Sequence, residues 1–202
     1  AATRLRRLRE DAQIVVFERS GHVSFANCGL PYHVGGVIED REDLLLQTPE
    51  SLAARFALDV RVLNEVVGID PTARTVEIRD LRDGHTYSEP YDELILSPGA
   101  RPVRPPIPGI ERALTLRDIE DTDRMIEVLA NGVSTAAIIG GGFIGLELTE
   151  NLVKRGLKVT LVEATDQVMA PLDPEMVEPV QQRIRKHGVT LVLGKSVVEI
   201  GA

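Results

Sequence analysis

Residues 135–163 read TAAIIGGGFIGLELTENLVKRGLKVTLVE, and this stretch decides the fold. The short apolar run Thr135–Ile139 predicts a buried parallel strand. Glycines with the spacing G-x-G-x-x-G follow it. Apolar residues at helical spacing then predict a helix over Phe143–Arg155, which Gly156 closes. A second apolar run, Lys158–Val162, predicts the next strand, so the stretch is expected to form a β-α-β unit.

Each glycine of the turn has a physical role in a unit that binds a dinucleotide. Gly140 allows the tight turn, Gly142 lets the backbone approach a pyrophosphate, and Gly145 lets the helix pack close to the strand. The helix starts at Phe143 and Ile144, where free N–H groups and the helix dipole favour an anion. The sequence therefore predicts a cofactor site at this turn. Turns and close packing also select glycine, but here strand, turn, helix and second strand all occur in order.

An acid at the end of the second strand indicates which dinucleotide binds. Glu163 stands 23 residues after Gly140 and can accept hydrogen bonds from a ribose 2′-hydroxyl. A carboxylate at this place repels a 2′-phosphate, and no arginine directly follows it. We therefore predict NADH rather than NADPH. The alternative is that Glu163 is an ordinary exposed acid at the end of a strand.

The N-terminal half repeats part of this pattern. A helix over Ala1–Arg9, a strand over Gln13–Phe17 and the terminal Glu18 are what would follow a glycine turn, and Glu18 would then hold an adenosine ribose. Many α/β proteins contain a helix, a strand and an acid in this order, so the pattern alone leaves both interpretations open. From Leu58 to Asp83-Gly84 and beyond, alternating segments predict an antiparallel meander. Glu93–Ser97 then predicts a continuous buried strand.

The fold class expected is α/β, with two Rossmann-like, doubly wound nucleotide-binding domains and the meander as an insertion. The connector from Pro102 to Gly109 is rich in proline and marks the boundary. We place one partial domain at residues 1–104 and another at 105–202. The chain starts without Met inside a predicted helix and stops at the β-rich run Val197–Ile200, so we expect it to be a fragment.

Charge and composition exclude several functions. The 202 residues carry 23 Lys plus Arg against 31 Asp plus Glu, a net charge of -8, which disfavours nucleic acid as a partner. No apolar stretch approaches the ~20 residues that span a bilayer, so we expect no membrane association. The chain has one cysteine, Cys28, which cannot form an internal disulfide and favours a cytoplasmic location. No metal site is predicted.

The chain resembles a known family in three places. They are the run VSFANCGLPY at residues 23–32, the segment LILSPGA at residues 94–100, and the glycine turn at residues 140–145. All three are similar to the single-cysteine, FAD-dependent pyridine nucleotide-disulfide oxidoreductases, with the coenzyme A-disulfide reductases as the nearest group. The resemblance covers essentially the whole chain. It implies an enzyme with FAD and NADH as cofactors, a cytoplasmic homodimer in the full-length protein, and CoA disulfide as the substrate.

The same resemblance implies roles for individual residues. FAD would contact Glu18, the backbone near Val66, and the segment Ser97, Pro98, Gly99 and Ala100. Phe143 and Glu147, four apart on one helical face, would gate the flavin and contact the nicotinamide amide. The alternatives are that Phe143 belongs to the core and Glu147 to the helix surface.

The resemblance also places the catalytic chemistry at Cys28. Five residues later, where dithiol relatives carry a second cysteine, stands His33, so the substrate must supply the second sulfur. A helix expected over Gly29–Val37 would stabilise the thiolate, and Asn27 and Ser24 could hydrogen-bond the sulfur or the substrate. The alternative for Cys28 is a small buried hydrophobe.

The arginine-rich N-terminus offers a site for the phosphates of CoA. Arg4 and Arg7 lie three apart on one helical face, and by family analogy they bind the substrate. A solvated helix surface is the alternative. Two further functions stay open for the protein: a related NADH oxidase, peroxidase or persulfide reductase acting through Cys28 sulfenic acid or persulfide, and a nucleotide-binding module without redox activity. We expect the fragment itself to be inactive.

Overall fold

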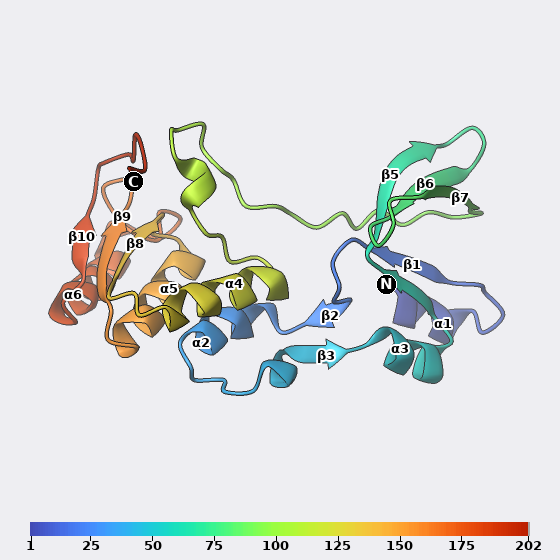
Figure 1. Cartoon of the computed structure of the whole chain (residues 1–202), viewed down its shortest axis with the longest axis horizontal. Coiled ribbons are helices and arrows are strands. Elements are labelled where there is room, and N and C mark those ends of the chain that lie inside the picture. Colours follow the sequence, from blue (N-terminus) through green and yellow to red (C-terminus); the bar gives the residue numbers. More distant parts are fainter. Residues whose placement is uncertain (202) are drawn as a thin grey trace. The chain divides into compact units, whose positions relative to one another are not determined.

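The computed structural model describes residues 1–201, and their contacts divide the chain into two compact units (Figure 1). Unit 1 combines Ala1–Ala26 with Leu45–Gly99, and unit 2 combines Asn27–Leu44 with Ala100–Ala202. Both contain helices and open sheets, so the α/β class is confirmed. One division between the units falls at Gly99 and Ala100, and the segment Asn27–Leu44, which contains Cys28, belongs to unit 2.

Unit 2 contains the β-α-β unit that the sequence predicts. Strands β8 (Thr135–Ile139), β9 (Lys158–Val162) and β10 (Thr190–Val192) form a parallel sheet in the order β10-β9-β8. Helix α5 (Phe143–Lys154) connects the first two strands and α6 (Pro174–Lys186) connects the last two. Ile139 pairs with Val162, so the residues that follow these two strands lie at the same edge of the sheet.

The core of unit 2 lies between this sheet and its helices. Val159 and Leu161 from β9 are 2% and 0% exposed, and Leu148 and Leu152 from α5 pack against them. Full burial of each such side chain stabilises the fold by about 1.5–3 kcal/mol. Ile144, four residues before Leu148 in α5, is 58% exposed. It lies in the first turn of α5, at the carboxyl edge of the sheet.

The segment after Cys28 packs onto unit 2. It comprises the 3₁₀ turn η1 (Asn27–Gly29), helix α2 (Leu30–Val34) and a second 3₁₀ turn, η2 (Arg41–Leu44). Helix α2 contacts α5 and α4 (Ile119–Ala130), and Val34 is fully buried in the core. The helix is shorter than the expected Gly29–Val37, because Gly36 adopts the left-handed conformation with φ of +77°.

An ion pair anchors the end of this segment to α4. The Arg41 guanidinium donates two hydrogen bonds to the Asp123 carboxylate, each of 2.9 Å. Hydrogen bonding to this carboxylate raises the pKa of Arg41, against the opposing effect of burial. A bidentate arginine–carboxylate pair holds both partners in one geometry.

Unit 1 contains a two-stranded parallel sheet with helices beside it. Strand β1 (Val15–Glu18) pairs with β4 (Asp59–Val62), and helices α1 (Ala2–Leu8) and α3 (Pro49–Phe56) flank them in the chain. Ile14, Leu52 and Leu58 form its buried core. Val60 and Val62, which the sequence pattern assigned to the meander, belong to β4. A short antiparallel pair, β2 (Ser24–Phe25) and β3 (Leu45–Gln47), completes the unit together with the meander.

The meander has the antiparallel form that the alternating pattern predicts. Strands β5 (Asn64–Asp70), β6 (Thr75–Asp80) and β7 (Thr86–Pro90) pair in this order. The turn between β6 and β7 contains Gly84 with φ of +80°, a conformation that glycine adopts without strain. The prediction of an Asp-Gly turn is therefore confirmed.

Two expected strands do not form. Glu93–Ser97 has no strand conformation, and Ile95 and Leu96 are 61% and 67% exposed rather than buried. The run Val197–Ile200 is also not a strand, and the Ile200 N–H donates to the Pro108 carbonyl. A strand is stable only beside a hydrogen-bonded neighbour, and no segment within residues 1–201 pairs with either run.

The connector between residues 100 and 118 contains one short element, the 3₁₀ turn η3 (Ile110–Arg112). Within the part of the chain that the structure describes, no helix combines the length and apolarity needed to cross a membrane.

Candidate functional site

The glycine turn between β8 and α5 has the geometry of a dinucleotide site. Gly140 has φ of +104°, which side chains rarely tolerate, and its N–H donates to the Val162 carbonyl across the edge of the sheet. A Cβ on Gly145 would overlap the Gly140 carbonyl and stand 3.4 Å from Ile138. Gly145 therefore provides the close contact between helix and strand.

Gly142, the N-cap of α5, faces open space. Apart from Gly142 itself and its neighbours along the chain, no described residue has an atom within 4 Å of the position that a Cβ would take there. The first N–H groups of α5 therefore stand beside room for a ligand, and the partial positive charge of a helix N-terminus favours an anion. These N–H groups suit the negative charge of a dinucleotide pyrophosphate.

Glu163 follows β9 and hydrogen-bonds to the glycine turn. Its Oε2 accepts from the Gly141 N–H at 2.7 Å, and its Oε1 accepts from the N–H and the hydroxyl of Thr165 at 2.8 and 2.9 Å. Partial burial raises the pKa of this carboxyl, but hydrogen bonds from Thr165, Gly141 and Ala164 outweigh it and hold the pKa below its ordinary value. The carboxylate is therefore ionised at neutral pH. Oε1 already accepts two hydrogen bonds, whereas Oε2 accepts one and keeps a lone pair that can accept from a ribose hydroxyl.

Sequence reasoning missed Thr165, which holds the carboxylate of Glu163 in place. A hydroxyl residue two positions after a strand-end acid is the signal that could have indicated it, because such residues bond locally to neighbouring backbone and side chains. The Thr165 hydroxyl also bonds to the Gln167 carbonyl at 2.8 Å.

The start of α5 presents side chains to solvent. Phe143 is 60% exposed, so the alternative that it belongs to the core is wrong. Glu147, four residues later, is half-buried. An exposed aromatic ring beside a glycine turn can cover a flat ligand ring. The role of Phe143 in gating the flavin stays a prediction.

Cys28 lies in the 3₁₀ turn η1 and is exposed, as is its neighbour Asn27. The alternative of a small buried hydrophobe is therefore wrong for this thiol. Ser24, in β2, belongs to unit 1. His33 is buried, and its Nδ1 hydrogen-bonds to the Ile38 carbonyl at 2.7 Å, so its ring packs inside unit 2.

The arginines of α1 separate into two kinds. Arg6 donates to the carbonyls of Phe56 and Ala57 at 2.8 and 2.9 Å, where α3 ends, so it has a structural role. Arg4 and Arg7 are exposed on the neighbouring face of the helix. These are the two residues that sequence reasoning selected for the substrate phosphates.

The residues predicted to contact FAD come from several segments. Glu18 ends β1, and its Oε1 accepts from the Ser20 N–H at 2.7 Å. Val66 lies at a β-bulge, where the register of β5 against β6 shifts and the side chain is 40% exposed. A bulge interrupts regular pairing and can leave backbone groups for a ligand. The nucleotide's ribose and adenine suit a carboxylate and a polar backbone edge of this kind.

The segment Ser97–Ala100 is exposed and non-regular, and Gly99 has φ of +68°. The Ala100 carbonyl accepts from Arg117 Nε at 3.1 Å, and the Arg117 N–H in turn donates to the buried Asp121 carboxylate at 2.9 Å. Sequence reasoning missed this link. An arginine just before the N-cap of a helix carries no distinguishing pattern in the sequence.

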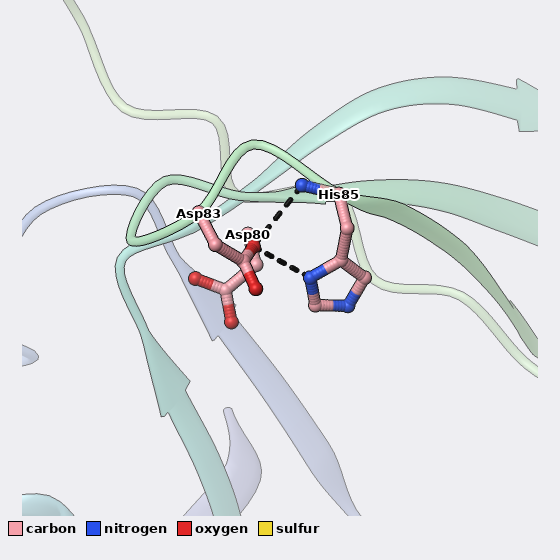
Figure 2. Close-up of side chains that lie close together, drawn as sticks. All are labelled: Asp80, Asp83 and His85. Atoms are coloured by element: carbon pink, nitrogen blue, oxygen red, sulfur yellow. Dashed lines mark hydrogen bonds and ion pairs between the residues drawn. The ribbon is translucent and has the colours of Figure 1, made fainter.

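One cluster of possible metal ligands lies in the turn of the meander. Figure 2 shows Asp80, Asp83 and His85 together, with Asp83 accepting from the His85 N–H at 3.1 Å and hydrogen-bonded to its Nδ1 at 2.6 Å. The hydrogen bond from His85 lowers the pKa of Asp83. Asp80 accepts from the N–H and the guanidinium of Arg82 at 2.9 and 3.1 Å. The three side chains therefore have partners within the turn, and we assign them no metal.

Comparison with known proteins identifies the family. The pyridine nucleotide-disulphide oxidoreductase profile matches residues 1–202. The chain belongs to this family. The family uses FAD and NAD(P)H, and the glycine turn followed by Glu163 fits a dinucleotide cofactor.

Individual family members resemble this chain over nearly all of its length. Coenzyme A disulfide reductase from Staphylococcus aureus strain bovine RF122 / ET3-1 is 37% identical over 202 residues, which is 98% of this chain and 45% of that protein. The structure of reduced Bacillus anthracis CoADR-RHD is 50% identical with a TM-score of 0.95, covering 98% of this chain and 36% of that one.

Other family structures have different printed activities. A NAD-dependent persulfide reductase from A. fulgidus is 36% identical with a TM-score of 0.95, covering 100% of this chain and 38% of its own. A water-forming NADH oxidase from Lactobacillus brevis, bound to NADH, is 32% identical with a TM-score of 0.92. The match covers 99% of this chain and 45% of that one. The chain thus spans less than half the length of these relatives.

Proposed function

We propose that the full-length protein reduces CoA disulfide, or a related small disulfide, with electrons from NADH through Cys28. The observation that carries this proposal is the exposed position of the chain's single sulfur nucleophile. Family members named coenzyme A disulfide reductase support the choice of substrate. With one cysteine in the chain, the second sulfur of each disulfide intermediate comes from the substrate.

The chemistry at Cys28 balances with two electrons per turnover. The Cys28 thiolate attacks one sulfur of the disulfide, forms a mixed disulfide and releases the first CoA thiolate. Two electrons from NADH then break the mixed disulfide, which frees the second CoA thiolate and restores the Cys28 thiolate, while NADH becomes NAD⁺ and releases one proton. Bound FAD supplies the relay of these two electrons. Asn27 and Ser24 are the proposed hydrogen-bond donors near the sulfur.

Unit 2 would hold NADH at the turn between β8 and α5. Gly140, Gly142 and Gly145 shape the cradle, Glu163 accepts from the adenosine ribose, and the α5 N-terminus at Phe143 and Ile144 faces the pyrophosphate. A carboxylate and no adjacent arginine favour NADH over NADPH, since the 2′-phosphate would meet a like charge. The half-buried Glu147 is the proposed contact of the nicotinamide amide.

Unit 1 would bind most of FAD, and α1 the CoA phosphates. Glu18 is the proposed ribose acceptor, the bulge at Val66 lies beside the adenine, and Ser97–Ala100 contact the flavin. Arg4 and Arg7, exposed and three apart, supply two positive charges toward phosphates. We further propose FAD-binding and NADH-binding domains at residues 1–104 and 105–202, a homodimer, and a cytoplasmic location.

The test uses the full-length, FAD-loaded protein and follows the loss of NADH absorbance. CoA disulfide, a persulfide, hydrogen peroxide and oxygen are offered separately as acceptors. We expect CoA disulfide to be reduced fastest and Cys28→Ser to abolish that activity. The same variant should keep NADH-dependent reduction of an artificial dye, because dyes take electrons without a protein thiol. Full activity of Cys28→Ser with CoA disulfide would overturn the proposal.

The persulfide reductase and the NADH oxidase among the relatives support a second candidate function. In that case Cys28 would cycle through a persulfide or a sulfenic acid, and the persulfide, peroxide or oxygen arm would be the fastest. A purified protein without flavin absorbance that binds NADH would instead indicate a nucleotide-binding module.

A further inference from the structure

Gly35 and Asn151 form a close contact between the Cys28 segment and helix α5. Gly35 is the C-cap of α2, and Asn151 lies in the third turn of α5 with no exposed surface. A Cβ at Gly35 would overlap Oδ1 of Asn151 and stand 2.7 Å from its Cβ and Cγ. Atoms at that distance repel strongly, so α2 and α5 can pack this closely only with glycine at residue 35.

The Asn151 side chain is held in the orientation that makes this contact. Its Nδ2 donates to the Glu147 carbonyl, one turn earlier in α5, at 2.8 Å. Its Oδ1 is buried and accepts no hydrogen bond within residues 1–201. A buried oxygen without a donor destabilises a fold. The unpaired Oδ1 of Asn151 therefore lowers the stability of the fold. A contribution to stability does not explain why an asparagine occupies this position.

The two helices carry the two halves of the proposed redox path. Cys28 lies in η1, which runs directly into α2, and Val34 of α2 is fully buried in the core. Phe143 and Glu147 lie on the first two turns of α5. The separation of α2 from α5 therefore sets how far the sulfur stands from the residues proposed to contact the nicotinamide.

We propose that Gly35 and Asn151 are positioning residues that hold Cys28 at a defined distance from helix α5, whose residues Phe143 and Glu147 are proposed to contact the nicotinamide. This inference rests on the proposed function for its catalytic consequence. Helix α5 is packed against β8 and β9, whereas α2 has five residues and ends at two glycines. A larger residue at 35 would therefore displace α2, and Cys28 with it, while the dinucleotide cradle on α5 keeps its place.

The experiment compares Gly35→Ala, Asn151→Gly and the double variant in the full-length, FAD-loaded protein. All three atoms nearest to the added methyl belong to the Asn151 side chain, so Asn151→Gly makes room for it. Ile184→Ala in α6 is the control for general loss of stability, because Ile184 packs on the same core from another helix. We expect this control to lower Tm and to leave kcat within about twofold.

Two measurements separate positioning from general damage. Hydrogen exchange reports on α2 through the Gly35 and Val37 amides, which donate to Pro31 and Tyr32 at 2.9 and 2.8 Å. In Gly35→Ala we expect this exchange to accelerate about tenfold or more, and kcat with CoA disulfide to fall about 100-fold, the cost of a misplacement of about 1 Å. The rate at which NADH bleaches the flavin should change less than about threefold. In the double variant, the exchange rate of these amides and kcat should both return most of the way to their wild-type values.

The inference is overturned if Gly35→Ala exchanges and turns over like the wild type, if it slows flavin bleaching as much as turnover, or if the double variant recovers nothing. Should Gly35→Ala alone not fold, the double variant decides: folded protein supports the contact and unfolded protein contradicts it. A wild-type protein that fails to reduce CoA disulfide refutes the proposed function, while the exchange comparison still tests the contact.

Discussion

Replacing Glu163 by alanine should change which dinucleotide the protein prefers. In the wild type this carboxylate is ionised and bonded to Gly141 and Thr165 at the edge where the ribose is proposed to bind. Removing it deletes a charge-assisted hydrogen bond to the ribose, a loss of about 1.5–3 kcal/mol. NADH should therefore bind about 10- to 150-fold more weakly.

NADPH should respond in the opposite direction. Two like unit charges about 4 Å apart repel by about 1–4 kcal/mol between the limits of bulk water and a protein surface. Glu163→Ala removes this repulsion against the 2′-phosphate. The ratio of the NADPH to the NADH dissociation constant should thus fall by about 100-fold or more, even if a looser glycine turn weakens both dinucleotides equally.

The assay is a calorimetric titration of the full-length protein with each dinucleotide, after a thermal melt has shown that the variant is folded. Thr165→Ala is the matched control, because it removes a hydroxyl bonded to Glu163 at 2.9 Å but keeps the charge. It should weaken both dinucleotides alike and leave the preference unchanged. A ratio that stays within threefold of the wild type in Glu163→Ala would refute the assignment of Glu163 to the ribose.

Three further results are expected. Arg7→Ala should raise the KM for CoA disulfide about tenfold, with a smaller effect at high salt. Arg6→Ala should leave KM unchanged and lower the free energy of unfolding by about 1–3 kcal/mol, because it removes the hydrogen bonds at the end of α3. Equal effects of the two variants on KM in a steady-state assay would contradict this division. Gly145→Ala should abolish NADH binding or folding, because its Cβ would overlap the Gly140 carbonyl, and a variant with normal binding by titration would show that the turn is wrongly assigned. The pKa of Glu163 lies below its ordinary value. The contribution of its carboxylate to the free energy of unfolding should therefore be complete above about pH 4.3 and disappear as the pH falls through the lowered pKa. If urea melts give the same difference in unfolding free energy between wild type and Glu163→Ala at about pH 7 and at about pH 2.5, this expectation is wrong.

Local spacing carried the predictions that the structure confirms. A strand, a glycine turn, a helix and a second strand are encoded within 29 consecutive residues, so the β-α-β unit from Thr135 to Glu163 could be predicted from the sequence. The Asp-Gly turn of the meander was likewise determined by nearby residues. In each case the residues that specify the element are also the ones that form it.

Contacts between distant residues decided the rest. Ile95 and Leu96 have the composition of a buried strand, yet they are exposed, because strand formation depends on a neighbour and not on composition alone. Val60 and Val62 alternate like the meander but pair in parallel with β1. Their periodicity is the same in either arrangement, so sequence could not distinguish them.

The site shows the same division. The sequence by itself determined which residue types are available: one cysteine, three spaced glycines, two strand-end acids and a group of arginines. Only the tertiary structure decided that Cys28 is exposed, that Arg6 closes α3 while Arg4 and Arg7 face solvent, and that Gly35 meets Asn151. The physical reason is that exposure and close packing depend on residues that lie far apart in the chain, and a spacing pattern within one segment carries no record of them.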